Sequence, residues 1–198
     1  MNLPQAIIEE DAGKVSEDWH KHWSTVDDFI KYNPGARHRR RSVFSALKKI
    51  NFSSLLDVGC GQGELISEIL SSRKDVKRIH GCDISESVLE KNRKRFPTVT
   101  FSTIDLERGE PLNEEFDLVT CCEVVEHLWD RRRAFINLSK MIKKGGHLIV
   151  TCPSGYVFGT ERYWGHTIHP TVQELEEHAR LNNLEVVYIN NWGWPLYY

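Results

Sequence analysis

The chain has 198 residues, of which 40% are hydrophobic and 27% charged, so it can bury one globular core. Its formal net charge of −2 provides no general basic surface that would attract nucleic acid. No apolar run is long enough to span a membrane, and the first residues lack the charged-then-apolar pattern of a secretory leader. We therefore expect a cytoplasmic protein without a membrane partner.

The N-terminal segment differs in composition from the rest of the chain. Residues 1–34 are polar and predict one or two helices that cover the cofactor or substrate site, whereas residues 35–198 predict one domain. Four arginines within residues 37–41 open the helix that precedes the first strand. This basic run could contact a phosphate or a nucleic acid, but we favour a solvated helix face.

A glycine-rich loop follows the first predicted strand. Residues 53–64 run from an apolar strand through Asp57 into Gly59, Gly61 and Gly63, which is typical of a tight strand-to-helix turn. With no Cβ atoms in the way, a ligand can lie against backbone N–H groups at the start of the next helix. The loop reads G-x-G-x-G rather than the G-x-G-x-x-G of NAD-binding domains, and Asp57 would repel a pyrophosphate. A carboxylate here favours a ligand with an ammonium or sulfonium group, which points to S-adenosylmethionine.

Three further strands are predicted along the chain, and an acid stands at or just after the end of each. The strands span residues 78–84, 99–105 and 116–122, and the acids are Asp83, Asp105 and Glu123. Ligands of an open parallel sheet bind beyond the carboxyl ends of its strands. We therefore expect these side chains and the glycine loop to lie together at one edge of the sheet.

The glycine loop and the strand-terminal acids resemble the motifs of class I S-adenosylmethionine-dependent methyltransferases. The resemblance implies an α/β fold with a doubly wound, mainly parallel sheet and helices on both faces. It also implies that Asp83 binds both ribose hydroxyls with Ile84 beside the adenine, and that Asp105 and Leu106 hold the adenine. Further cofactor contacts are assigned to Asp57, Gly59, Cys60, Gly61, Gly63 and Glu123.

The remaining elements fit this fold with one gap. The seventh strand that is usual in the resembled family has no clear counterpart, so the chain is either a fragment or ends in a shorter segment. We favour a truncated or continuing chain. Helices are predicted over residues 64–72, 85–96, 131–143 and 171–182, with Gly145 and Gly146 ending the third, and strands over residues 147–153 and 185–190.

Two acids and a histidine follow the fourth strand as Glu123-Val-Val-Glu126-His127. His127 is the candidate general base for a hydroxyl acceptor, because its ordinary pKa lies near neutrality and Glu126 can raise its proton affinity. The same three residues could instead hold Mg or Mn, with His166 as a further ligand. The aromatic loop over residues 153–170 is expected to cover the acceptor.

The Glu-x-x-Glu-His pattern resembles ubiquinone-pathway O-methyltransferases and also small-RNA 3′-terminal 2′-O-methyltransferases, in which the acids and histidine hold a metal. Thr167, Ile168, His169 and Pro170 replace the aromatic and basic residues expected after the last histidine of the RNA enzymes, so RNA is the less favoured acceptor. We therefore predict a methyltransferase that acts on a small-molecule acceptor, preferably at oxygen. The alternatives are a metal-dependent RNA 2′-O-methyltransferase, a cofactor-binding partner subunit without catalysis and, more distantly, an NAD-linked enzyme.

Overall fold

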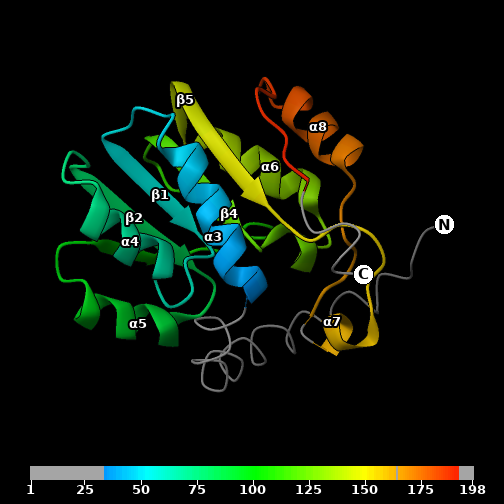
Figure 1. The fold of residues 1–198 in the computed structure, drawn as a ribbon, viewed down its shortest axis with the longest axis horizontal. Coiled ribbons are helices and arrows are strands. Elements are labelled where there is room, and N and C mark those ends of the chain that lie inside the picture. Colours follow the sequence, from blue (N-terminus) through cyan, green and yellow to red (C-terminus); the bar gives the residue numbers. More distant parts are fainter. Residues whose placement is uncertain (1–33, 164, 192–198) are drawn as a thin grey trace.

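Five parallel strands form one sheet in the order β3-β2-β1-β4-β5 (Figure 1). The computed structural model describes residues 34–163 and 165–191, so the cover predicted for residues 1–34 lies outside the described residues except for Pro34. The chain runs outward from β1 to β3 and then returns to the other side of β1 as β4. Ligands of such sheets bind at the carboxyl ends of the strands beside this reversal, here between β1 and β4. The strands are β1 (Ser54–Val58), β2 (Arg78–Asp83), β3 (Thr100–Thr103), β4 (Phe116–Cys122) and β5 (Ile142–Thr151).

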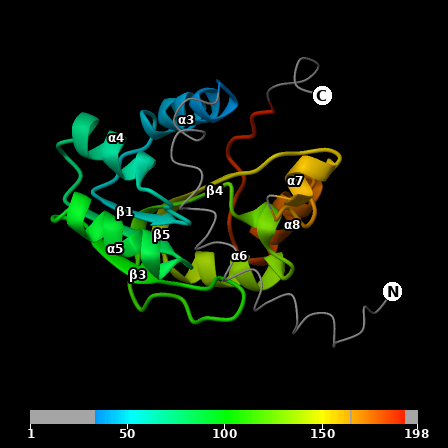
Figure 2. The same ribbon diagram turned by 90° about the horizontal axis from the view of Figure 1, so that it is seen from below.

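Helices cover both faces of the sheet, which confirms the predicted doubly wound α/β fold. Figure 2 shows α3 and α4 on one side of the strands and α6 on the other. Two buried apolar clusters fill the two layers: one joins the sheet to α3, α4 and α5, and the other joins it to α6 and α8. The helices are α3 (Pro34–Leu47), α4 (Glu64–Ser72), α5 (Glu86–Arg95), α6 (Arg131–Lys140), α7 (Gly159–Tyr163) and α8 (Val172–Leu181).

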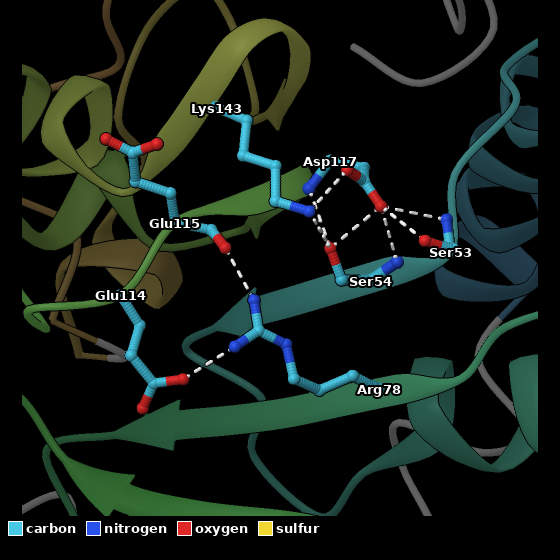
Figure 3. Close-up of polar contacts among 7 residues, drawn as sticks. All are labelled: Ser53, Ser54, Arg78, Glu114, Glu115, Asp117 and Lys143. Atoms are coloured by element: carbon cyan, nitrogen blue, oxygen red, sulfur yellow. Dashed lines mark hydrogen bonds and ion pairs between the residues drawn. The ribbon is translucent and has the colours of Figure 1, made fainter.

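A polar network ties the amino ends of the strands together, at the edge opposite the expected ligand site (Figure 3). Asp117 Oδ2 accepts hydrogen bonds of 2.8–3.0 Å from the backbone N–H and hydroxyl groups of Ser53 and Ser54. Its other oxygen accepts from Lys143 Nζ at 2.7 Å, and this contact in particular holds the pKa of Asp117 well below its usual range. The network therefore links the starts of β1, β4 and β5.

The helix after β4 is shorter than predicted. It ends at Lys140, and Gly145 and Gly146, which were expected to end it, lie inside β5. Phe116 pairs with Ile142, but Leu118 pairs with His147, so β5 carries extra residues that bulge out of the ladder. Gly145 has a φ of 76°, a conformation that glycine adopts without strain, and the glycine pair therefore serves the bulge rather than a helix end.

The strand predicted for residues 185–190 is wrong. Residues 184–191 pair with no strand in the described structure, and Val187 and Tyr188 are 77% and 64% exposed. β-branched and aromatic residues favour a strand only where a neighbouring strand pairs with them and a packed face buries them, and the described residues provide neither for this segment. Within the two described ranges, no helix is long and apolar enough to cross a membrane.

Candidate active site

The glycine loop after β1 takes a conformation that only glycine adopts easily. Gly59, Gly61 and Gly63 have φ values of 70°, 48° and 76°. A Cβ on Gly59 would lie 2.2 Å from Cγ2 of Val124, and one on Gly63 would lie 2.6 Å from the ring of Phe96. The loop therefore presses against the residues after β4 on one side and against α5 on the other.

Asp83 ends β2 and is held beside this loop. Its Oδ2 accepts from the Gly61 N–H at 2.9 Å, and its Oδ1 accepts from the Ser85 N–H at 2.9 Å. The side chain is 5% exposed, so its direction is well determined by these two bonds. A carboxylate can accept hydrogen bonds on both of its oxygens, which is the chemistry that the two hydroxyls of a ribose require.

Asp57 lies in the interior below the loop, 3% exposed, where Thr120 Oγ1 donates to its Oδ1 at 2.8 Å. Burial raises the pKa of Asp57 to about 7; the Thr120 hydrogen bond lowers it, and the charge of Asp83 raises it further.

Cys60 is also buried, and burial raises the pKa of its thiol well above the usual value, so it packs in the core rather than reacting.

The segment after β3 is shaped by Asp105. Its Oδ1 accepts from the backbone N–H groups of Glu107 at 2.8 Å and Arg108 at 3.0 Å, which closes a turn. The Leu106 side chain is 4% exposed and belongs to the core cluster under α6, so only its backbone can face a ligand. Ile84 after β2 is 36% exposed and is free to contact a ring.

Arg39 of α3 reaches the residues after β4. Its Nη1 lies 2.8 Å from Oε2 of Glu123, while Oε1 of Glu123 accepts from Thr151 Oγ1 at 3.0 Å. Burial raises the pKa of Glu123, and the Arg39 charge opposes that rise. The sequence indicated only a basic run at residues 37–41; which arginine points to the strand ends depends on how α3 packs on the sheet.

A second group of polar side chains comes together next to Glu123. Glu126, His127 and His166 have ligand atoms that all lie within 4.8 Å of one another. Glu126 and His127 belong to the short 3-10 helix Val125–His127, and His166 comes from the loop after β5. His127 and His166 meet edge to face with ring centroids 4.8 Å apart. Three of the four predicted metal ligands are therefore adjacent, whereas Glu123 lies outside this trio and pairs with Arg39.

Glu126 is the most constrained of these groups. It is 1% exposed, and its Oε2 is buried with no hydrogen-bond partner among the described residues. Burial, and secondarily the charge of Glu123, raise its pKa well above the usual range. A carboxyl in this state needs a proton, a cation or a hydrogen-bond donor beside it.

The loop after β5 is fastened to the 3-10 helix. The Thr167 N–H and hydroxyl donate to the Glu126 carbonyl at 2.9 and 3.0 Å. A further histidine and an acid follow His166 in a chain of contacts. His166 Nδ1 lies 2.8 Å from His169 Nε2, and His169 Nε2 lies 3.8 Å from Glu161 Oε1. The sequence reasoning did not assign His169 or Glu161 to the site, although the His-x-x-His spacing was a visible signal. Tyr156 and Phe158, two aromatic residues of the loop that is predicted to cover the acceptor, meet edge to face with ring centroids 5.3 Å apart and are 69% and 48% exposed.

Comparison with known proteins agrees with this geometry. Residues 56–148 match a family model described as a methyltransferase domain. The chain is 36% identical over 98 residues to a ubiquinone biosynthesis O-methyltransferase of Coxiella burnetii, a region that makes up 48% of this chain and 41% of that protein. The chain therefore spans less than half the length of this curated relative.

Solved structures show the same fold. The N-methyltransferase NodS from Bradyrhizobium japonicum WM9, in complex with S-adenosyl-L-homocysteine, aligns with a TM-score of 0.65 and 23% identity over 83% of this chain and 85% of its own. The methyltransferase domain of bacterial CtHen1-C aligns with a TM-score of 0.57 and 28% identity over 73% of this chain and 80% of its own. S-adenosylmethionine suits the site described above, because the bare glycine loop and the two acceptor oxygens of Asp83 meet the needs of a nucleoside.

Proposed function

We propose that this chain, which has the class I fold, is an S-adenosylmethionine-dependent methyltransferase that moves a methyl group to an oxygen atom of a small-molecule acceptor. The observation that carries the proposal is the cluster of Glu126, His127 and His166 at the carboxyl end of β4. Two imidazoles and a buried carboxyl lie together where the strand order reverses, which is where an acceptor would meet a cofactor bound at the glycine loop.

The cofactor contacts follow the strand ends. Asp83 binds the ribose hydroxyls, Ile84 packs beside the adenine, and the turn at Asp105 and Leu106 meets the adenine edge. The amino-acid end of S-adenosylmethionine carries an ammonium and a carboxylate, and the Arg39–Glu123 pair offers the complementary charges. When bound, S-adenosylmethionine supplies an electrophilic methyl group on a sulfonium.

His127 acts as the base for the acceptor. Its Nδ1 lies 3.1 Å from the carbonyl oxygen of Gly165, which can only accept, so Nδ1 carries a proton and Nε2 is the basic nitrogen. The acceptor hydroxyl gives its proton to this nitrogen as the oxygen–carbon bond forms and the carbon–sulfur bond breaks. A hydroxyl needs such a base more than a neutral amine does, which favours oxygen as the attacked atom. The similarity to a ubiquinone biosynthesis O-methyltransferase supports the same choice.

A metal-dependent variant is the second candidate. The unpartnered Oε2 of Glu126 and the two adjacent histidines are a donor set that fits a divalent cation. Two imidazoles suit Mn or another transition metal better than Mg, which prefers oxygen ligands. Such a cation would polarise a pair of acceptor oxygens, as in the small-RNA 2′-O-methyltransferases that the sequence resembles. The likeness to CtHen1-C supports this candidate, while residues 167–170 count against RNA.

Isothermal titration of the purified protein with S-adenosylmethionine and S-adenosylhomocysteine tests the proposal. The titration is repeated after EDTA and then with Mg or Mn, and release of S-adenosylhomocysteine is followed with a panel of phenols, catechols and hydroxy acids. We expect binding that is independent of metal and turnover with at least one hydroxyl acceptor. Turnover that disappears with EDTA and returns with Mn favours the metal-dependent candidate. Binding without turnover on any acceptor favours a silent partner subunit, and no binding overturns the proposal.

A further inference from the structure

We infer that two buried asparagines, Asn92 and Asn137, are positioning residues for cofactor binding. Each donates hydrogen bonds from its side-chain amide to backbone carbonyls on one side of the nucleoside site. The inference rests on the proposed function, because it concerns the loops to which we assign the ribose and adenine contacts. Asn92 comes from α5 and Asn137 from α6, so the two residues approach the site from opposite faces of the sheet.

Asn92 holds the glycine loop from below. It is 2% exposed, and its Nδ2 donates to the Gly61 carbonyl at 2.6 Å. The N–H of the same glycine donates to Oδ2 of Asp83 at 2.9 Å. Because a trans peptide points its C=O and N–H in opposite directions, a Gly61 carbonyl turned toward α5 directs the Gln62 N–H away from α5. Asn92 therefore sets the orientation of the loop and, through Gly61, the position of the Asp83 carboxylate.

Asn137 holds the segment after β3 in the same way. It is 0% exposed, and its Nδ2 donates to the Leu106 carbonyl at 2.9 Å and to the Gly109 carbonyl at 3.1 Å. The Leu106 carbonyl and the Glu107 N–H form one peptide unit. The Glu107 N–H donates to Oδ1 of Asp105 at 2.8 Å. A single peptide unit, Leu106–Glu107, thus lies between Asn137 and Asp105. A single residue, Gly61, lies between Asn92 and Asp83, through its C=O and its N–H.

Burial of the Asn137 amide is costly, which indicates that its donor group is needed. Oδ1 of Asn137 is buried and has no hydrogen-bond partner among the described residues. A leucine has nearly the same size and would avoid this unpaired oxygen, but it would leave the Leu106 and Gly109 carbonyls without their donor. The unpaired oxygen is therefore tolerated for the sake of the two bonds that shape the loop.

Replacement of each asparagine by aspartate tests the inference. Asn92→Asp and Asn137→Asp keep the shape of the side chain but turn a donor into an acceptor that faces a carbonyl. Asn182→Asp is the matched control, since Asn182 Nδ2 also donates to a backbone carbonyl, that of His178 at 2.8 Å, at the end of α8. Titration with S-adenosylhomocysteine and with adenosine is performed well below each melting temperature. Asn92→Ala and Asn137→Ala serve the same purpose if an aspartate variant does not fold.

We expect about tenfold weaker binding of both ligands for the Asn92 and Asn137 variants, because the two loops enclose the nucleoside half of the cofactor. Asn182→Asp should lower the melting temperature without a change in affinity. Lower melting temperatures with unchanged affinity at positions 92 and 137 overturn the inference and leave the proposed function standing. Failure of the unmodified protein to bind S-adenosylhomocysteine overturns the proposed function and this inference with it.

Discussion

Arg39 Nη1 and Glu123 Oε2 lie 2.8 Å apart and join α3 to the residue that follows β4. The two side chains are 30% and 24% exposed, so the ion pair stands at the surface of the site rather than in the core. It places a positive and a negative charge together at the carboxyl edge of the sheet. No other ion pair of the described residues connects α3 to this edge.

Arg39→Ala should weaken binding of S-adenosylhomocysteine by about 1.5–3 kcal/mol, the range for hydrogen bonds to charged groups. The reason is that we assign the Arg39 guanidinium to the carboxylate at the amino-acid end of the cofactor. Adenosine lacks that end and should bind the variant as well as it binds the unmodified protein. Isothermal titration with both ligands measures the difference, and Arg37→Ala, an exposed arginine of the same helix, is the control. Equal losses for adenosine and S-adenosylhomocysteine would contradict the assignment.

Asp83→Ala should weaken binding of S-adenosylmethionine by a similar amount, about 1.5–3 kcal/mol, through loss of the ribose hydroxyl contacts. Here adenosine should lose as much affinity as the full cofactor, because the ribose belongs to both. Asp75→Ala removes an exposed carboxylate paired with Arg73 and should leave both affinities unchanged. Isothermal titration of both variants with S-adenosylmethionine and with adenosine measures these affinities. An unaltered affinity in Asp83→Ala would remove the ribose assignment.

Gly59→Ala should lower the free energy of unfolding by about 2–5 kcal/mol, the sum of a strained left-handed conformation and an overpacked contact. The new Cβ would meet Cγ2 of Val124 at 2.2 Å, and the backbone φ is 70°. The double variant Gly59→Ala, Val124→Ala removes the contact but keeps the backbone strain. Its loss in free energy of unfolding should therefore be smaller than the sum of the losses in the two single variants. Urea unfolding of the three variants gives the coupling energy. A strictly additive double variant would show that the Val124 contact is not the cause.

The stability of the protein should depend on pH through Asp57. Its pKa rises from 3.8 to about 7 on folding, so between these values the folded protein keeps a proton that the unfolded chain has lost. The free energy of unfolding should therefore fall as pH rises from about 4 to about 7, and this contribution should be constant above that range. Asp57→Asn should remove that part of the slope. Urea unfolding at several pH values, compared between the two proteins, measures it.

His127→Ala should lower turnover by about 10²–10⁴-fold, the usual range for loss of a general base. Affinity for S-adenosylhomocysteine should change little, because the imidazole is assigned to the acceptor. His38→Ala, which alters an exposed histidine on α3, is the control. Steady-state kinetics with the best hydroxyl acceptor, combined with titration, separates the two effects. Turnover that survives the loss of His127 would exclude both the base and the metal-ligand role.

Local signals were sufficient for much of the fold. The apolar run and the glycine loop after it predicted β1 and the start of α4, and the helix predicted over residues 64–72 has the bounds of α4, since strand burial and turn chemistry act over neighbouring residues. A helix was predicted over residues 171–182, and at its start the Thr171 hydroxyl accepts from the Glu174 N–H at 3.1 Å and caps α8. The same local reasoning failed at residues 185–190, because strand formation depends on pairing with a neighbouring strand, and residue composition alone does not reveal that pairing.

The sequence by itself determined the chain order of the first five strands and of the acids at their ends, and with it the class I fold and the edge of the sheet at which Asp57, Asp83 and Asp105 lie. Only the tertiary structure decided which distant side chains meet there. It selected Arg39 from a run of arginines, brought His166 to Glu126 and His127, and placed Asn92 and Asn137 under the two loops. The physical reason is that hydrophobic periodicity and turn chemistry are local properties of the chain. Contacts between remote residues depend instead on how the helices pack on the sheet.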